Sequence, residues 1–289
     1  MALMPFDDRD GSIWINGEMI PWREATSHTL SHGLHYASTV FEGERVYSGV
    51  IFKGREHTER LRRSCEMLDF ELPLSDDELD AAKMAVVEAN GIVDGYVRAF
   101  AWRGSEMMAI SAQHTTTHVA IAAWEWPSYF DPETKMKGIT LDIADWKRPS
   151  PESAPVHAKA AGLYMICTLS KHAAEKKGFQ DALMLDYRGY LAEATGANVF
   201  FVDKEGTIHT PIADCFLDGI TRRTVIALAE SLQMKVVQRH LTLDDLSEMT
   251  ECFLTGTAAE VTPVSQIGDA SFTPGDISRQ LVDGYENLV

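Results

Sequence analysis

The chain has 289 residues, 45% hydrophobic and 24% charged, proportions typical of a soluble globular protein with one large domain or two ordinary ones. Its formal net charge is −17, which argues against nucleic acids and anionic membranes as partners because their phosphates would be repelled. A small anionic ligand held in a local basic pocket is compatible with this charge.

Neither a membrane segment nor a disulfide framework is indicated. The N-terminal residues are acidic, which predicts no signal peptide, and no apolar run approaches the roughly 20 residues that span a bilayer. The cysteines are far apart and form no C-x-x-C pair: Cys65, Cys167, Cys215 and Cys252. We therefore expect a cytoplasmic protein.

Turn signals and hydrophobic periodicity predict hairpins, helices and strands before residue 127. The expected hairpins cover 13–22 and 40–52, the helices 55–70 and 75–91, and the strands 95–102 and 116–126. Asn16-Gly17 is a strong turn signal, and Ser75 with Glu78 forms a capping box.

Prolines, charges and a glycine predict a linker over 127–138, between domains over 1–126 and 139–289. In the second domain we expect strands over 139–146, 181–187, 190–203, 235–240 and 251–255, and helices over 163–177, 219–233 and 243–249. This order predicts a mixed α/β fold of two domains.

Lys159 lies among small residues, in the stretch from Pro155 to Tyr164. Small neighbours let a flat molecule approach the amine, and an apolar setting lowers the pKa of a lysine. A neutral amine can attack a carbonyl and form a Schiff base. A surface lysine in an alanine-rich turn also explains this stretch taken alone.

Two segments of the same half could hold a phosphate. Gly219-Ile220-Thr221 opens a predicted helix, whose first N–H groups form an anion site. The second segment, 255–259, follows a strand and places two threonines around Gly256. Threonines at such positions are often only caps, but with Lys159 they point to a phosphorylated cofactor.

Glu193 lies in an otherwise apolar predicted strand. A buried carboxylate requires a cationic or hydrogen-bonding partner, and a protonated ring nitrogen would suit it. A glutamate at the surface end of a strand is the alternative. His28, His32 and His35 are spaced for one helical face, but Gly33 disfavours a helix and no Glu or Cys lies among them, so we predict no metal site.

Together these motifs resemble the fold-type IV pyridoxal-phosphate enzymes, the class IV aminotransferases, and among them most closely the branched-chain amino acid aminotransferases. The residues that carry the resemblance are Lys159, Glu193 with Gly196 and Asn198, 217–222, 255–260, His35-Tyr36, 40–43 and 55–61. The resemblance runs from about Trp14 to Val264 and implies a two-domain α/β architecture with its cofactor site at the domain interface.

The resemblance also implies a cofactor, pyridoxal 5'-phosphate (PLP), and a role for each matching residue. Lys159 would form the Schiff base and later carry the proton, Glu193 would pair with the pyridine nitrogen, and Tyr164 would bond the phenolic oxygen. The phosphate would be held by Arg60, Ile220, Thr221 and Thr257. Further cofactor-binding positions are Asn198, Leu217, Gly219 and Gly256.

The substrate side is implied in the same way. Tyr96, with the backbone at Thr257 and Ala258, would receive the α-carboxylate, and Arg98 would meet the distal carboxylate of glutamate. The side-chain pocket would be walled by Tyr36, Phe41, Trp126 and Tyr129, with the partner subunit's Ile110. Ordinary core packing is the alternative for each of these aromatic residues.

The implied activity is ping-pong transfer of the amino group of L-leucine, L-isoleucine or L-valine to 2-oxoglutarate, by a cytoplasmic homodimer or larger homo-oligomer in amino-acid biosynthesis. Small-molecule amino acids and 2-oxo acids would be its partners. Three alternatives stay open: a D-amino acid or (R)-amine transaminase, an enzyme similar to aminodeoxychorismate lyase, and a catalytically inactive binding protein. Ala99 and Asp218 stand where the family usually has proline, which leaves room for unusual amino donors.

Overall fold

Residues 5–126 and 136–289 are described by the computed structural model, and they divide into two units. Unit 1 comprises residues 5–126 together with Ala158–Gly162, and unit 2 comprises residues 136–157 and Leu163–Val289. The domain limits expected from the sequence do not include this return of Ala158–Gly162 to unit 1. The segment matters because it contains Lys159.

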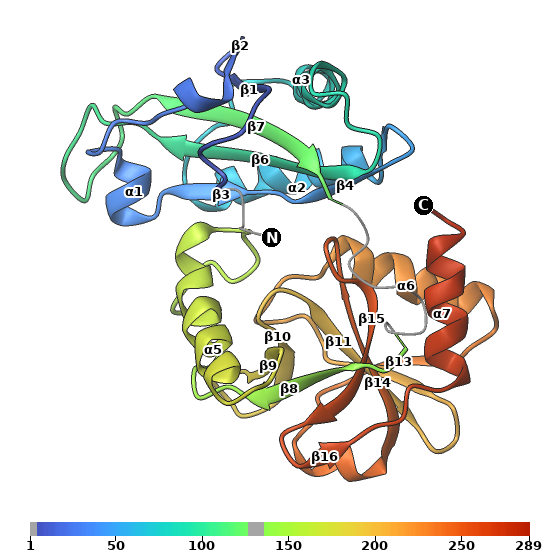
Figure 1. Ribbon diagram of the computed structural model, residues 1–289. Coiled ribbons are helices and arrows are strands. Elements are labelled where there is room, and N and C mark those ends of the chain that lie inside the picture. The colour runs from blue at the N-terminus through green and yellow to red at the C-terminus, as the bar shows by residue number, and fades with distance from the viewer. Residues whose placement is uncertain (1–4, 127–135) are drawn as a thin grey trace. The chain divides into compact units, whose positions relative to one another are not determined.

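Unit 1 is built on an antiparallel sheet with the strand order β2-β1-β7-β6-β4-β5, and β3 also pairs with β6 (Figure 1). Its strands are β1 (Ser12–Ile15), β2 (Glu18–Pro21), β3 (Thr39–Phe41), β4 (Glu44–Tyr47), β5 (Val50–Ile51), β6 (Gly95–Arg103) and β7 (Thr117–Glu125). Both predicted hairpins are confirmed. The second begins at Glu44, because the residues from Thr39 to Phe41 form a separate strand.

Two amphipathic helices cover this sheet, α2 (Gly54–Met67) and α3 (Asp76–Ala89). The predicted capping box is present: the Glu78 amide donates to the Ser75 hydroxyl at 3.2 Å, and the Ser75 amide donates to the Glu78 carboxylate at 2.8 Å. The helices pack on each other, and α3 also lies against β7 and β1.

A short helix that the sequence argued against is also present, α1 (His32–Tyr36). The objection was Gly33, but here the missing side chain is what the packing needs. A Cβ at Gly33 would lie 2.6 Å from the Thr39 hydroxyl oxygen and 2.9 Å from Cβ of Trp102. Close packing therefore outweighs the low helix propensity of glycine.

Unit 2 is built around a ring of strands. The pairing order is β10-β9-β8-β15-β14-β11, and β10 also pairs with β11, which closes the ring; β12, β13 and β16 extend it. The strands are β8 (Ile139–Ile143), β9 (Asp181–Leu185), β10 (Leu191–Ala194), β11 (Asn198–Asp203), β12 (Ile208–Thr210), β13 (Val236–Gln238), β14 (Met249–Gly256), β15 (Glu260–Ile267) and β16 (Ala270–Ser271). The rings of Phe200 and Phe253 stack 5.0 Å apart on neighbouring strands.

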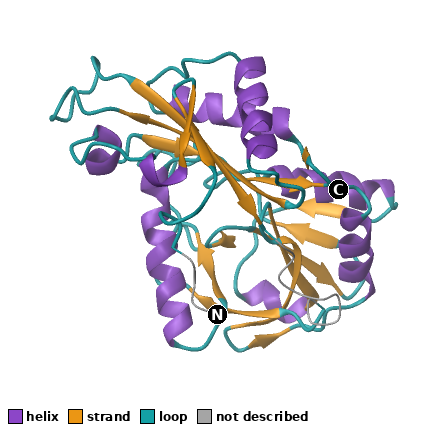
Figure 2. Cartoon of the chain, turned by 45° about the horizontal axis from the view of Figure 1, so that its top comes forward, coloured by secondary structure: helices purple, strands orange, loops and turns teal. Residues whose placement is uncertain are grey.

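Helices pack against these strands in the described part of unit 2, and Figure 2 draws helices in purple and strands in orange. These helices are α5 (Met165–Lys176), which lies against β8 and β9, α6 (Ile220–Ser231) and α7 (Asp276–Glu286), which pack on each other and on β14. Among the helices of residues 5–126 and 136–289, none combines the length and the apolar character that crossing a membrane requires.

Most predicted elements of unit 2 are confirmed, with two corrections. The strand expected over 190–203 is two strands, because the chain turns between Ala194 and Asn198 and pairs with itself. The helix expected over 243–249 is a 3-10 helix, Asp244–Glu248. The sequence did not predict β12, β15, β16 or α7.

Candidate active site

Lys159 is anchored by its backbone in unit 1. Its amide donates to the hydroxyl of the buried Ser64 on α2 at 3.0 Å, and its carbonyl accepts from the amide of Phe41 at 3.1 Å. The next residue, Ala160, forms an antiparallel bridge with Val40 on β3. The lysine is thus fixed between a strand and a helix that lie far from it in sequence.

The amine of Lys159 lies in a setting that favours its neutral form. Burial is the main cause and the positive charge of Arg60 the next, and together they lower the pKa of Lys159 to about 8, against the opposing charge of Glu42. Its Nζ lies 5.0 Å from the centroid of the Phe41 ring. The interpretation of Lys159 as an ordinary surface lysine is therefore not supported.

Arg98 lies between the rings of two other residues that were expected to bind substrate, Phe41 and Tyr96. Cζ of Arg98 lies 4.6 Å from the centroid of the Phe41 ring and 5.5 Å from that of Tyr96. The structure thus brings Lys159, Phe41, Tyr96 and Arg98 together. Tyr96 and Arg98 follow each other closely on β6, which pairs with β3 through the partners Phe41 and Phe100.

Gly43 makes room for Tyr96. A Cβ at Gly43 would overlap the Tyr96 hydroxyl and would lie 2.6 Å from its Cζ. Any side chain at this position would therefore displace the phenol ring.

Arg60 is held by a buried carboxylate. Its Nε and Nη2 donate to Oε1 and Oε2 of Glu42 at 2.6 and 2.8 Å, and Nδ1 of His57 lies 2.6 Å from Oε2. The three side chains are buried, and His57 and Arg60 lie on one face of α2.

In unit 2, Glu193 on β10 has polar partners in Asn198 and Arg148. Nδ2 of Asn198 donates to its Oε2 at 3.2 Å, and Nε of the buried Arg148 lies 3.4 Å from its Oε1. Glu193 is half-buried. It is thus a fixed carboxylate and not a freely solvated strand end.

Asn198 joins this carboxylate to the start of α6. Its amide donates to the carbonyl of Leu217 at 2.9 Å and accepts from the amide of Gly219 at 3.2 Å. Gly219 is the N-cap of α6, so the free N–H groups of the first turn, at Ile220 and Thr221, begin beside it. The predicted helix start is confirmed.

The second predicted phosphate segment lies beside Asn198. Thr255 on β14 pairs directly with Asn198 on β11, and a turn over 257–259 follows. A Cβ at Gly256 would lie 3.3 Å from that of Ala197, so glycine at this position lets the backbone at 256 approach the turn before β11 closely. The cofactor-binding residues expected in unit 2, apart from Tyr164, thus gather at one end of β10, β11 and β14.

Comparison with known proteins agrees with this arrangement. Residues 39–267 match the family described as amino-transferase class IV. The chain belongs to this family. It is 44% identical to a probable branched-chain-amino-acid aminotransferase of Rickettsia conorii over 293 aligned positions, covering 100% of this chain and 99% of the relative.

Other relatives of this class IV aminotransferase carry similar names. It is 38% identical to the branched-chain-amino-acid aminotransferase of Pseudomonas aeruginosa, with 99% of this chain and 95% of the relative covered. Among solved structures, the branched-chain amino acid aminotransferase of Thermobaculum terrenum in its PLP form superimposes with a TM-score of 0.87 at 31% identity, covering 96% of this chain and 94% of the other. The predicted fold-type IV architecture is thereby confirmed.

The remaining expected site residues of the aminotransferase differ in how far they are exposed to solvent. Tyr164 ends the 3-10 helix Ala161–Tyr164 and is half-buried, and the Trp126 ring lies 5.4 Å from that of Tyr96. Thr257 is half-buried and Ala258 is exposed. Tyr36 and Ile110 are 42% and 82% exposed, and Tyr129 lies outside the described residues.

Several residues of these clusters were not assigned a role from sequence, among them Glu42, His57, Ser64 and Arg148. Glu42 belongs to a motif that carries the family resemblance, but nothing local indicates that it holds Arg60. Arg148 gives no sequence signal at all. Among the three histidines of 28–35, His28 accepts from the Leu30 amide, His32 contacts Ser38 and Ala109, and His35 contacts the Thr29 carbonyl.

Proposed function

We propose that this aminotransferase transfers the amino group of L-leucine, L-isoleucine or L-valine to 2-oxoglutarate with PLP as its cofactor. The observation that carries the proposal is the cluster in unit 1, where a lysine with a pKa of about 8 lies beside Phe41, Tyr96 and Arg98. The names of relatives that align over the whole chain support the substrate class.

The donor and acceptor groups of the chain fit PLP. In unit 1 the guanidinium of Arg60 can bind an anion, and in unit 2 the first-turn N–H groups of α6 and the hydroxyl of Thr257 can do the same. A protonated pyridine nitrogen suits Glu193, whose carboxylate is already oriented by Asn198 and Arg148. When bound, PLP supplies an aldehyde and a ring that accepts electrons.

Lys159 supplies both a nucleophile and a proton carrier. Because its pKa is about 8, a substantial fraction of the amine is neutral near neutral pH, and the ammonium form is acidic enough to return a proton. The anchored backbone limits where the amine can reach. We assign Lys159 as the catalytic residue.

The substrate residues suit two kinds of side chain. Phe41 offers an apolar surface to an aliphatic chain, and Arg98, lying over that ring, offers a cation to the distal carboxylate of glutamate. Tyr96 would receive the α-carboxylate. A single pocket can then serve both half-reactions of a ping-pong cycle.

We propose a cytoplasmic homodimer. The exposed Ile110 and Tyr36 are apolar side chains that an interface would cover, in keeping with the expectation that the partner subunit's Ile110 walls the pocket. Sedimentation of the purified enzyme would give its oligomeric state.

A substrate panel tests the function. Purified enzyme should bind PLP with a yellow colour, and borohydride should fix the cofactor to Lys159. It should transaminate L-leucine with 2-oxoglutarate, and Lys159→Ala should abolish turnover. Activity confined to D-alanine or an (R)-arylamine would refute the substrate assignment, as would pyruvate release from aminodeoxychorismate without an amino acceptor.

A further inference from the structure

The contact between Glu42 and Arg60 has the geometry of a fork. Two nitrogens of the guanidinium, Nε and Nη2, each meet a separate carboxylate oxygen, at 2.6 and 2.8 Å. Two parallel charge-assisted bonds fix both the position and the plane of the group.

The carboxylate that makes this fork is itself fixed and ionised. Glu42 is 0% exposed, and burial alone would raise its pKa, but Arg60 and then His57 outweigh that effect and hold the pKa well below its ordinary value. His57 contacts the same oxygen, Oε2, that Nη2 of Arg60 contacts. The group that orients Arg60 is therefore held from a second side.

We propose that Glu42 is a positioning residue, whose carboxylate, secured by His57, holds the Arg60 guanidinium ready for the phosphate of the cofactor. This inference rests on the proposed function, in which Arg60 binds that phosphate. An arginine already ordered loses less side-chain entropy when the anion binds, so the affinity for phosphate is higher.

The charge of Glu42 acts in the opposite direction from its positioning. A carboxylate beside Arg60 partly neutralises the guanidinium, so removing it would strengthen the attraction for a phosphate if charge alone mattered. Positioning and charge thus predict opposite signs for the same substitution. This makes the role of Glu42 testable.

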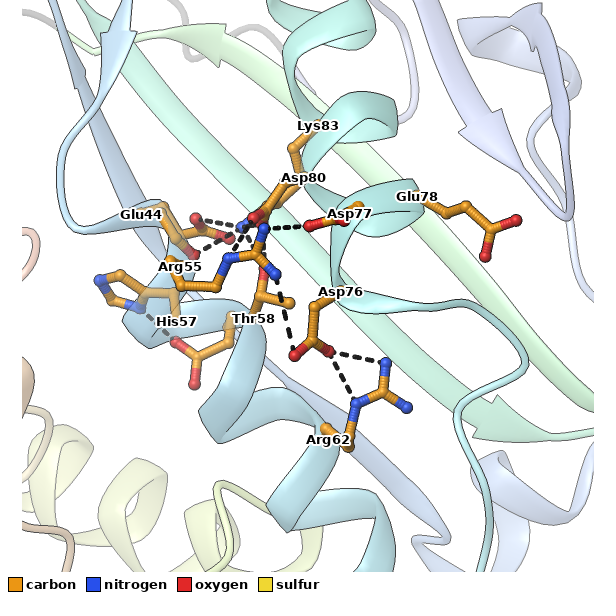
Figure 3. Close-up of polar contacts among 12 residues, drawn as sticks. Glu44, Arg55, His57, Thr58, Arg62, Asp76, Asp77, Glu78, Asp80 and Lys83 are labelled. Carbon is orange, nitrogen blue, oxygen red and sulfur yellow. Dashed lines mark hydrogen bonds and ion pairs between the residues drawn. The ribbon is translucent and has the colours of Figure 1, made fainter.

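The chain offers a matched control in a second buried glutamate. Glu44, two residues on, pairs with the buried Lys83 at 2.8 Å, and Lys83 also donates to Thr58 at 2.7 Å, as Figure 3 shows. Its ion pair is thus formed with a different cation from the one that Glu42 holds. Glu44→Gln therefore disturbs a buried ion pair of the same kind while leaving both Glu42 and Arg60 in place.

The experiment measures how much the phosphate group contributes to cofactor binding. The dissociation constants of PLP and of pyridoxal, which lacks the phosphate, are determined for the apo forms of the wild type, Glu42→Gln and Glu44→Gln. The dissociation constant of pyridoxal divided by that of PLP isolates the contribution of the phosphate to binding. Changes in the reactivity of Lys159, which the charge of Glu42 also influences, affect both ligands alike and cancel in this ratio.

We expect the ratio to fall about tenfold in Glu42→Gln, the cost of one side chain ordered on binding, and to stay at the wild-type value in Glu44→Gln. An unchanged or larger ratio in Glu42→Gln would overturn the proposal. Glu42→Asp retains the charge but shortens the reach by one methylene. It should also lower the ratio, and an unchanged ratio there would count against positioning even if Glu42→Gln does not fold.

Failure of the proposed function would give a different result. A wild-type enzyme that binds PLP no better than pyridoxal would show that Arg60 does not serve a phosphate at all. A wild type with a strong preference for PLP, and a Glu42→Gln variant with the same preference, would refute only the role of Glu42.

Discussion

In the cofactor-free enzyme, Lys159 should react as an amine with a pKa of about 8 instead of the ordinary 10.5. Each pKa unit changes the neutral fraction tenfold. At pH 7 roughly one Lys159 amine in ten should therefore be neutral, against about one in 3,000 for an ordinary lysine. The difference, about 300-fold, is the gain in nucleophilic amine that its surroundings provide.

Competitive labelling of the apo enzyme measures this pKa directly. A small anhydride reacts only with neutral amines, and peptide mass spectrometry reports the extent for each lysine as a function of pH. Labelling of Lys159 should rise with pH, reach half of its maximum near pH 8 and level off about one pH unit higher. Lys177 is the internal control, because its hydrogen bond to Asp142 raises its pKa, so its labelling should still be rising at pH 10.5.

The contribution of Arg60 to the lowered pKa of Lys159 can be tested by the direction in which that pKa moves when Arg60 is replaced. Arg60→Met removes a positive charge that disfavours the ammonium form and leaves Glu42 to favour it, so the midpoint for Lys159 should move upward. A midpoint for Lys159 equal to that of Lys177 in the wild type would refute the reasoning, and so would a downward shift in Arg60→Met.

Three further outcomes are expected. Glu193→Gln should still bind PLP but lose turnover by about a hundredfold or more, since a neutral amide cannot hold a ring proton; kcat and the visible spectrum of the bound cofactor measure the two effects. Gly43→Ala should raise KM for L-leucine about tenfold, because the added methyl displaces Tyr96, which steady-state kinetics would show. Asn198→Ala should weaken PLP binding by about tenfold, because both Glu193 and the start of α6 lose a hydrogen bond, and equilibrium dialysis would measure the loss.

Signals that act within a few residues predicted structure well. The Asn16-Gly17 turn and the capping box of Ser75 and Glu78 depend on backbone conformations and hydrogen bonds that the neighbouring residues determine, and both are present. The glycine-led start of α6 was found in the same way. The motif resemblance then correctly identified the family, although it did not show which side chains support the site.

Contacts between distant parts of the chain could not be predicted from the pattern. Ser64 and Lys159 are 95 residues apart, and Glu42 and Arg60 are 18 apart on different elements. Gly33 was misjudged for the same reason. Its low helix propensity is a local cost, whereas its close packing against Trp102 involves β6, which lies far from it in the sequence. Propensity scales contain no term for such contacts.

Glu42 and Gly43, which join β3 to β4, each contact a different part of the proposed site. Both strands pair with β6 in one continuous register, with Phe41 opposite Phe100 and Glu44 opposite Val97, and the Glu42 amide donates to the Ala99 carbonyl at 2.7 Å. Glu42 then meets Arg60, while Gly43 leaves room for Tyr96.

Because the Glu42 carboxylate holds Arg60 while Gly43 leaves room for Tyr96, substitutions of these two residues should affect separate quantities. Glu42→Gln should lower the preference for PLP over pyridoxal with little change in KM for L-leucine, and Gly43→Ala should do the reverse. Binding and steady-state measurements on the same two variants would test this. If each variant changed both quantities equally, the link between β3 and β4 would have moved as a whole, and the assignment of one role to each residue would be wrong.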